Sequence, residues 1–161
     1  GLEEKFGRKI PVIAAGGIYT GADAKRFMDL GASAVQLGSR FVTTNECDAS
    51  LKFKQSYLKA SESDIEIIQS PVGLPGRAIS SEFLNRVKNG LEKPKSCPFH
   101  CIKTCDYTKS PYCIIAALYS AFKGNFRKGY AFAVSNAFRS DRITSVKETF
   151  KSLLSEMNIK E

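Results

Sequence analysis

The stretches Ala14-Ala15-Gly16-Gly17-Ile18 and Gln36-Leu37-Gly38-Ser39-Arg40 decide the fold of this 161-residue chain. In each stretch a short, mostly apolar run ends at glycine, which is typical of a buried strand that enters a tight turn. About twenty residues separate them, the spacing of successive strands in a βαβ unit. The two stretches therefore predict two parallel strands whose ends open at the same edge of a sheet.

Helical patterns follow both stretches. Thr20 and Asp23 form a capping-box pattern before a run that ends at Gly31, where a glycine after a helix is expected. Residues 50–60 repeat the helical pattern, with Phe53 and Tyr57 one turn apart. Two consecutive βα units of this kind imply an α/β fold with right-handed crossovers.

The remaining chain is less regular. The patterns predict a strand over 64–70, a loop over 71–77, a short helix over 81–89, a Cys-rich stretch over 97–113, and two more helices at about 111–124 and 145–157. We expect one part over residues 1–90 and a second, Cys-rich and helical extension over residues 91–161.

Composition limits the function classes. With 43% hydrophobic residues the chain is expected to be globular, and no apolar run reaches the roughly 20 residues of a membrane span. The N-terminus lacks the layout of a secretory signal, so the expectation is a soluble, cytoplasmic protein without a membrane partner. The net charge is +2 over 1–89 (12 basic, 10 acidic) and +6 over 90–161 (12 basic, 6 acidic). The basic residues are dispersed, which favours a solvated surface over a nucleic-acid partner.

Glycine at two neighbouring strand ends is suited to binding a phosphate. Without a Cβ, the backbone N–H groups approach an anion closely, and a helix that follows adds its positive end. In an eight-stranded barrel the loops after the last two strands commonly hold a ligand phosphate. The alternative is that these glycines only make tight turns.

The residues around both stretches resemble a known family. Pro11–Ile18, Gly21–Ala24, Leu30–Ala32 and Val35–Phe41 resemble the C-terminal barrel strands of nitronate monooxygenases, with similarity continuing to about residue 85. The resemblance implies the C-terminal part of an FMN-binding (β/α)8 TIM barrel with a helical, Cys-rich extension. It also implies that FMN contacts the two stretches, at Gly16, Gly17, Ile18, Gln36, Leu37, Gly38 and Ser39.

The implied activity is that of an FMN-dependent oxidoreductase that oxidises an alkyl nitronate or similar small carbon acid with O2. Flavin-type enoyl-acyl-carrier-protein reductases share the pattern and give an alternative activity, while IMP dehydrogenases have a similar glycine pair. The family's catalytic histidine lies in an earlier Gly-Gly-His type motif that nothing here matches, and a whole barrel takes about 250 residues. We therefore expect a fragment without turnover of its own, which associates with itself.

Four of the five cysteines, Cys97, Cys101, Cys105 and Cys113, gather near His100. Clustered thiolates bind zinc or an iron–sulfur cluster, although this spacing matches neither common pattern. The alternative is that they pack as small reduced hydrophobes. A metal here would make residues 90–161 a metal-stapled interaction module, a third functional hypothesis.

Four single residues keep two interpretations each. His100 is either a metal ligand or base, or a solvated side chain. Cys47 is expected to be a packed or half-exposed thiol rather than a nucleophile. Arg40 neutralises a phosphate or forms a structural ion pair, and Arg77 contacts a ligand or a carbonyl.

Overall fold

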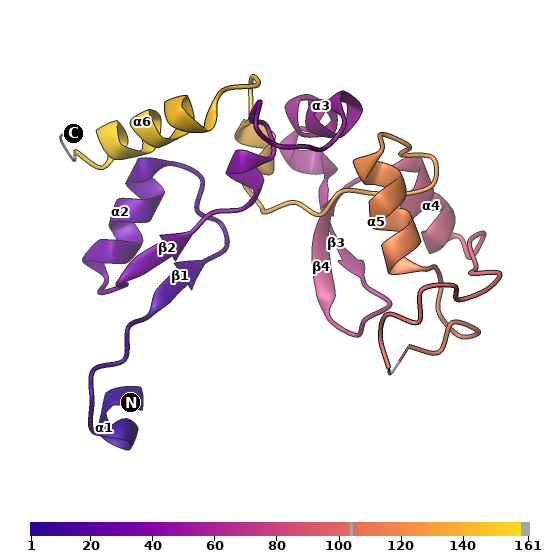
Figure 1. Ribbon diagram of the computed structural model, residues 1–161, viewed down its shortest axis with the longest axis horizontal. Coiled ribbons are helices and arrows are strands. Elements are labelled where there is room, and N and C mark those ends of the chain that lie inside the picture. The colour runs from indigo at the N-terminus through magenta and orange to yellow at the C-terminus, as the bar shows by residue number, and fades with distance from the viewer. Residues whose placement is uncertain (104, 159–161) are drawn as a thin grey trace.

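The computed structural model describes residues 1–103 and 105–158, without the side chain of Leu2. The chain forms an arch, with one group of elements around β1 and β2 and another around β3 and β4 (Figure 1). In chain order the elements are α1 (Leu2–Phe6), β1 (Ile13–Ala15), α2 (Gly21–Asp29), β2 (Ala34–Gln36), η1 (Ser39–Phe41), α3 (Leu51–Lys59), η2 (Glu62–Asp64), β3 (Ile65–Gln69), β4 (Pro75–Ile79), α4 (Glu82–Lys88), α5 (Ile114–Phe122), η3 (Ala137–Arg139) and α6 (Val146–Glu156).

Strands β1 and β2 confirm the expected parallel pair. They run side by side in a register that pairs Ile13 with Ala34 and Ala15 with Gln36. The helix between them, α2, begins with the expected capping box of Thr20 and Asp23, and Gly31 follows it with a positive φ of 101°. The α/β class is therefore confirmed, while the described residues form only this pair and one antiparallel hairpin, not a closed barrel.

Helix α6 lies along α2, so the end of the chain returns to its first βα unit (Figure 1). Ser145 and Glu148 form the expected capping box of α6. The contact is close because Gly21 has no side chain: a Cβ there would lie 2.1 Å from the Leu153 carbonyl oxygen. The backbone N–H of Gly21 also donates to Glu156 Oε2 at 2.8 Å. Gly21 thus serves as the crossing point of the two helices.

The loop predicted over 71–77 is partly wrong, because its second half belongs to β4. Strand β4 pairs with β3 in antiparallel register, Gln69 with Pro75 and Ile65 with Ile79. Proline is tolerated at the first residue of a strand, and Gly76 leaves room for the Phe132 ring, which a Cβ would approach to 2.4 Å. The turn residues themselves are 70–74.

Two hydrophobic clusters pack on the hairpin. One joins Tyr130 to Phe83 of α4 and Tyr112, and the other joins Tyr57 of α3 to Ile79 and Ala131. Residues 131–133 continue the hairpin, because Ile79 N–H donates to Ala131 and Ala133 N–H donates to Arg77. Elements from residues 1–90 and from 91–161 thus share both clusters, and the division into two parts stays a prediction.

Several large apolar side chains near β1 remain exposed. Val12 is 54%, Ile13 62% and Phe150 51% exposed. Such exposure is compatible with the expected self-association, which stays a prediction. In the described part of the chain, no helix has the length and apolar character needed to span a membrane.

Candidate functional site

Two glycine corners lie at the same edge of the β1–β2 pair. The first corner, Gly16–Ile18, follows β1, and the second corner, Gly38–Arg40, follows β2. Because Ala15 pairs with Gln36 in parallel register, the strands deliver both corners to one end of the sheet. Leu37 leads into the second corner directly from β2. The structure therefore brings the predicted site residues together.

The first corner depends on glycine for its backbone conformation. Gly16 and Gly17 have φ values of 88° and 71°, a region that residues with a Cβ rarely adopt. Nothing lies within 4 Å of a Cβ built at Gly16, so this side of the turn is open. At Gly17 the nearest atom would be Ser135 Oγ, at 3.7 Å. The open space beside Gly16 is where a ligand group has access to the backbone.

Backbone N–H groups at both corners are free. Within residues 1–103 and 105–158, the amides of Gly17, Ile18, Ser39 and Arg40 donate no hydrogen bond to any protein group. Four free donors on two adjacent turns form the donor set that an anion requires. A group with several acceptor oxygens, such as a phosphate, matches it.

The start of α2 does not join this donor set, contrary to the expectation that its positive end adds to the anion site. The Asp23 carboxylate already accepts from the amides of Tyr19 and Thr20, at 3.1 and 3.0 Å. The Gly21 amide is held by Glu156. Because two carboxylates occupy this terminus, the amides still free near it are those of the turn before it.

A segment of the C-terminal extension, the strap of residues 134–140, connects the two corners. The Val134 N–H donates to Ser39 Oγ at 3.1 Å, and Asn136 Nδ2 donates to the Gly17 carbonyl at 2.7 Å. No sequence pattern indicates this role, since Asn136 lies in an irregular stretch far along the chain from either glycine. One segment thus fixes both turns relative to each other.

The side chain of Arg40 extends from the second corner to an aromatic ring. Its Nη1 donates to Tyr19 Oη at 2.9 Å, and the guanidinium lies 4.7 Å from the Tyr19 ring centre. In the described part of the protein its buried Nε has no hydrogen-bond partner. Tyr19 is buried and also contacts Ser140 of the strap, Oη to Oγ 2.6 Å. Arg40 therefore brings positive charge to this edge of the sheet while it stacks on Tyr19.

A second arginine, Arg139 of the strap, forms an ion pair with the carboxylate at the start of α2. Its Nη1 lies 3.5 Å from Asp23 Oδ2. Burial acts to raise the pKa of Asp23, but the hydrogen bonds from Thr20 and Tyr19, with Arg139 nearby, hold it below its ordinary value. The Asp23 carboxylate is thus fixed in its charged form, paired to the strap.

The other single residues lie away from the corners. Arg77 is exposed on β4, and Cys47 is half-buried in the segment before α3. His100, with φ 44°, lies in the irregular segment between α4 and α5, at the other end of the arch from β1 and β2 (Figure 1). The chain's only histidine is therefore not part of the corner site.

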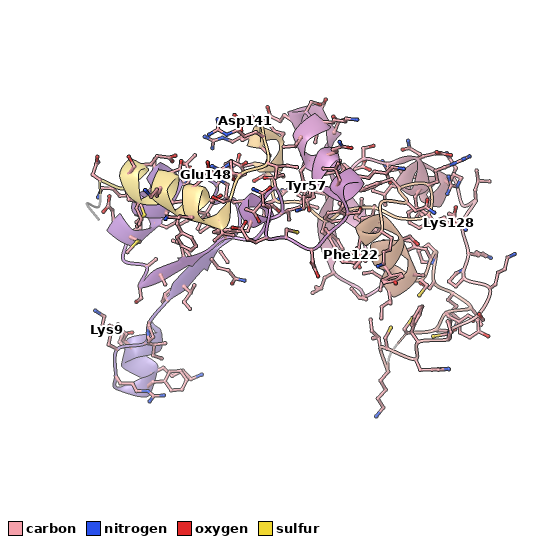
Figure 2. The ribbon with its side chains drawn as sticks, turned by 45° about the horizontal axis from the view of Figure 1, so that its top comes forward. Lys9, Tyr57, Phe122, Lys128, Asp141 and Glu148 are labelled. Atoms are coloured by element: carbon pink, nitrogen blue, oxygen red, sulfur yellow. The ribbon has the colours of Figure 1, made fainter. Side chains whose placement is uncertain are left out.

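The four clustered cysteines line a single small cavity next to α5, and Figure 2 shows sulfur atoms gathered beside the helix that carries Phe122. Partial desolvation, and then the charges of Cys97, Cys101 and Cys113, raise the pKa of the Cys105 thiol, in keeping with their proximity. In the residues that the structure describes, however, no three His, Cys, Asp or Glu side chains already stand close enough to hold a metal ion.

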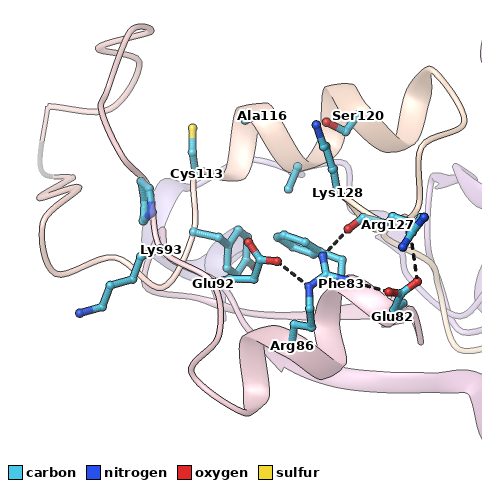
Figure 3. Close-up of a pocket in the computed structure, with 13 residues that line it drawn as sticks. Glu82, Phe83, Arg86, Glu92, Lys93, Cys113, Ala116, Ser120, Arg127 and Lys128 are labelled. Carbon is cyan, nitrogen blue, oxygen red and sulfur yellow. Dashed lines mark hydrogen bonds and ion pairs between the residues drawn. The ribbon is translucent and has the colours of Figure 1, made fainter.

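A larger cleft, of about 680 Å³, lies between α4 and α5 (Figure 3). Arg86 pairs with Glu82 at 3.1 Å and with Glu92 at 2.7 Å, and Arg127 lies 3.7 Å from Glu82. These charges pair with one another across the cleft, as the dashed contacts in Figure 3 show. Lys93 and Lys128 also line the cleft and take no part in these ion pairs, so the lining keeps an excess of basic side chains.

The geometry defines an α/β protein with two glycine turns at one sheet edge, and the family comparison agrees with this class. The family model described as nitronate monooxygenase matches residues 4–156. The chain belongs to the nitronate monooxygenase family.

The matches to individual relatives include only a part of this chain and a smaller part of each relative. The chain is 38% identical over 78 residues to a probable nitronate monooxygenase of Staphylococcus saprophyticus, covering 48% of this chain and 22% of the relative. It is 31% identical over 80 residues to an indene-carboxyl-CoA dehydrogenase of Rhodococcus jostii, covering 50% and 23%. The chain thus spans less than a quarter of either curated relative.

Solved structures match nearly the whole chain. FabK from Thermotoga maritima superposes with a TM-score of 0.73 at 28% identity, over 93% of this chain and 45% of FabK. A nitroalkane oxidase from Streptomyces ansochromogenes superposes with a TM-score of 0.67 at 22% identity, over 96% and 41%. The fold is therefore shared with just under half of each of these enzymes.

Proposed function

We propose that this chain provides the phosphate-binding end of an FMN site in an oxidoreductase of the nitronate monooxygenase type. The observation that carries the proposal is the pair of adjacent corners with four unpaired amides, at Gly17, Ile18, Ser39 and Arg40. A dianionic phosphate can accept hydrogen bonds from several backbone N–H groups only where no Cβ blocks its approach. The open side of Gly16 meets this condition.

The residues present fit this group at the turns. The free amides and the Ser39 side chain of the second corner bind and orient the phosphate, while Arg40 adds positive charge. The end of β2 also contributes to the proposed FMN contacts, through Gln36, Leu37 and Gly38. When bound, the flavin supplies the electron transfer that oxidises a small carbon acid, and the protein's role is to place it.

The proposed substrate class is an alkyl nitronate or a similar small carbon acid, with O2 as oxidant. It rests on the family match and on the resemblance to nitronate monooxygenases. The corner site holds no histidine, since His100 lies beyond α4. The chain therefore contributes cofactor positioning, and we expect no turnover from it alone.

A second candidate is a flavin-dependent enoyl-acyl-carrier-protein reductase activity. The similarity to FabK over 93% of the chain favours it. The two activities are separated by assaying the FMN-loaded protein, completed with the strands that its relatives carry, for oxygen uptake with a nitronate and for NAD(P)H oxidation with an enoyl thioester.

The cofactor proposal is tested by titrating the purified chain with FMN and with riboflavin, following flavin fluorescence. Riboflavin lacks the phosphate, so FMN should bind more tightly, and inorganic phosphate should compete with it. Equal binding of the two flavins, or no binding of either, would contradict the phosphate site.

A further inference from the structure

Much of the segment between α4 and α5 is weakly packed on the rest of the protein. This segment, the Cys loop of residues 91–113, contains neither helix nor strand in its described part. Apart from Tyr112 next to α5, several of its large side chains are poorly buried: Leu91 is 70%, Phe99 49% and Tyr107 39% exposed. Long loops without secondary structure are uncommon in compact domains, and little apolar burial offsets the entropy of ordering this one.

All four thiols of the Cys loop line the same cavity. Cys97, Cys101, Cys105 and Cys113 share it with apolar and hydroxyl side chains only, namely Pro71, Val72, Pro94, Ser96, Ile102, Tyr107, Ser110, Tyr112 and Ile114. Among the residues that the structure describes, no carboxylate, lysine or arginine lines it. Of these lining groups, the thiols are the strongest ligands for a soft or borderline cation.

The wall of the cavity that adjoins α5 is rigid. Tyr112 is 3% exposed, and its hydroxyl donates to Tyr130 at 3.1 Å in the hydrophobic core. The Ser110 hydroxyl donates to the Tyr112 carbonyl at 2.8 Å. Cys113 follows as the N-cap of the nine-residue helix α5 and makes no side-chain capping hydrogen bond. Its thiol is thus held at a fixed place and is free to bind another group.

The opposite wall comes from two tight turns. His100, with its positive φ, lies between Cys97 and Cys101, and the Cys105 N–H donates to the Ile102 carbonyl at 3.1 Å. These turns bend the loop back so that three thiols, distant from Cys113 in sequence by up to sixteen residues (113 − 97), face the same space.

We propose that these four cysteines bind one zinc ion that closes the Cys loop onto the start of α5. Structural zinc sites are four-coordinate and tetrahedral, and four cysteine thiolates are one of their usual ligand sets. No three of the thiols stand at coordinating positions in the described structure, so binding draws the Cys loop inward around the rigid Cys113. Metal binding and ordering of the loop are then one process.

The test is the metal content of the chain purified without chelator, measured by elemental analysis alongside a thiol count. The expected result is about one zinc per chain, lost in Cys97→Ser and Cys113→Ser and retained in the matched control Cys47→Ser, because Cys47 lies outside the cavity. Absence of zinc, equal loss in the Cys47→Ser control, or retention in Cys113→Ser overturns the site.

A second measurement decides the case if a serine variant fails to fold. Cobalt(II) added to the metal-free wild-type chain should give the absorption bands of tetrahedral thiolate coordination, and one equivalent of zinc should bleach them. Absence of those bands overturns the proposal. Loss of two mass units per cysteine pair indicates disulfides, and visible absorption with iron and sulfide indicates an iron–sulfur cluster; either result also overturns the zinc assignment.

Discussion

The Asn136 side chain donates a 2.7 Å hydrogen bond to the Gly17 carbonyl, across 119 residues of sequence. A trans peptide points its C=O and N–H in opposite directions, so holding the Gly17 carbonyl also orients the N–H of Ile18 away from Asn136. That N–H is one of the free donors of the first corner. Asn136 is thus a positioning residue for the proposed phosphate site, placed there by the C-terminal part of the chain.

Replacing Asn136 by alanine should weaken FMN binding about 2- to 10-fold, the effect of one lost hydrogen bond. The measurement is a fluorescence titration of both variants. Asn125→Ala is the matched control, because Asn125 lies in the turn after α5 and should bind FMN like the wild type. Equal affinities of Asn136→Ala and wild type would separate the strap from the site.

Gly21→Ala should destabilise the fold by about 1–3 kcal/mol through overpacking. The added Cβ would lie 2.1 Å from the Leu153 carbonyl oxygen and 2.7 Å from Glu156 Cβ, so α6 has to move off α2. Urea unfolding measures the change. Gly38→Ala is the control, because its φ of −117° suits alanine and nothing lies within 4 Å of the new atom. A Gly21→Ala variant as stable as the control would refute the close crossing.

Acid should weaken the contact between α2 and the strap. The Asp23 pKa is lowered in the folded chain, against about 3.9 in an unfolded one. Its contribution to stability is therefore complete above that unfolded value and is lost as the pH falls through the lower, folded pKa. Unfolding free energies measured between pH 6 and 3 should fall less steeply in Asp23→Asn. Parallel curves for the two proteins would count against this pairing.

Alkali should destabilise the chain through two buried tyrosines. Burial raises the pKa of Tyr57, and burial with the neighbouring Tyr112 raises that of Tyr130. Because the unfolded pKa is about 10, the unfolded chain releases these protons first, and stability declines above that pH. Ultraviolet absorbance of tyrosinate should therefore rise in two stages, with exposed Tyr119 in the first and these two only on unfolding. Full ionisation of all tyrosines in a still-folded chain would contradict their burial.

The elements of the fold that could be predicted are those whose sequence pattern lies within a few neighbouring residues. The capping boxes at Thr20 and Ser145, and the strand ends at Gly16 and Gly38, follow from neighbours in sequence, and the structure confirms the elements that they predict. Strand β4 was missed because Pro75 and Gly76 are turn formers by composition, and only the Phe132 ring explains the glycine there.

The glycines of the candidate site could be predicted from the sequence, but the residues that hold the two corners in place could not. Ser39 Oγ accepts from the Val134 N–H, and Asn136 donates to the Gly17 carbonyl. These long-range hydrogen bonds leave no periodic trace in the sequence. Likewise, no local pattern indicated that Glu156 joins Asp23 at the start of α2, since this second carboxylate comes from 135 residues away. A turn can be predicted from adjacent residues, whereas the long-range hydrogen-bond partners of that turn depend on how the whole chain folds.

The strap and α6 rest on the first βα unit through hydrogen bonds and packing, while the Cys loop that leads to them is largely exposed. A protease that nicks this exposed connection would therefore leave two polypeptides that co-purify, and the halves expressed separately should reassemble when mixed. Covalent continuity between residues 90 and 114 should therefore be dispensable for the corners, provided that both pieces are present.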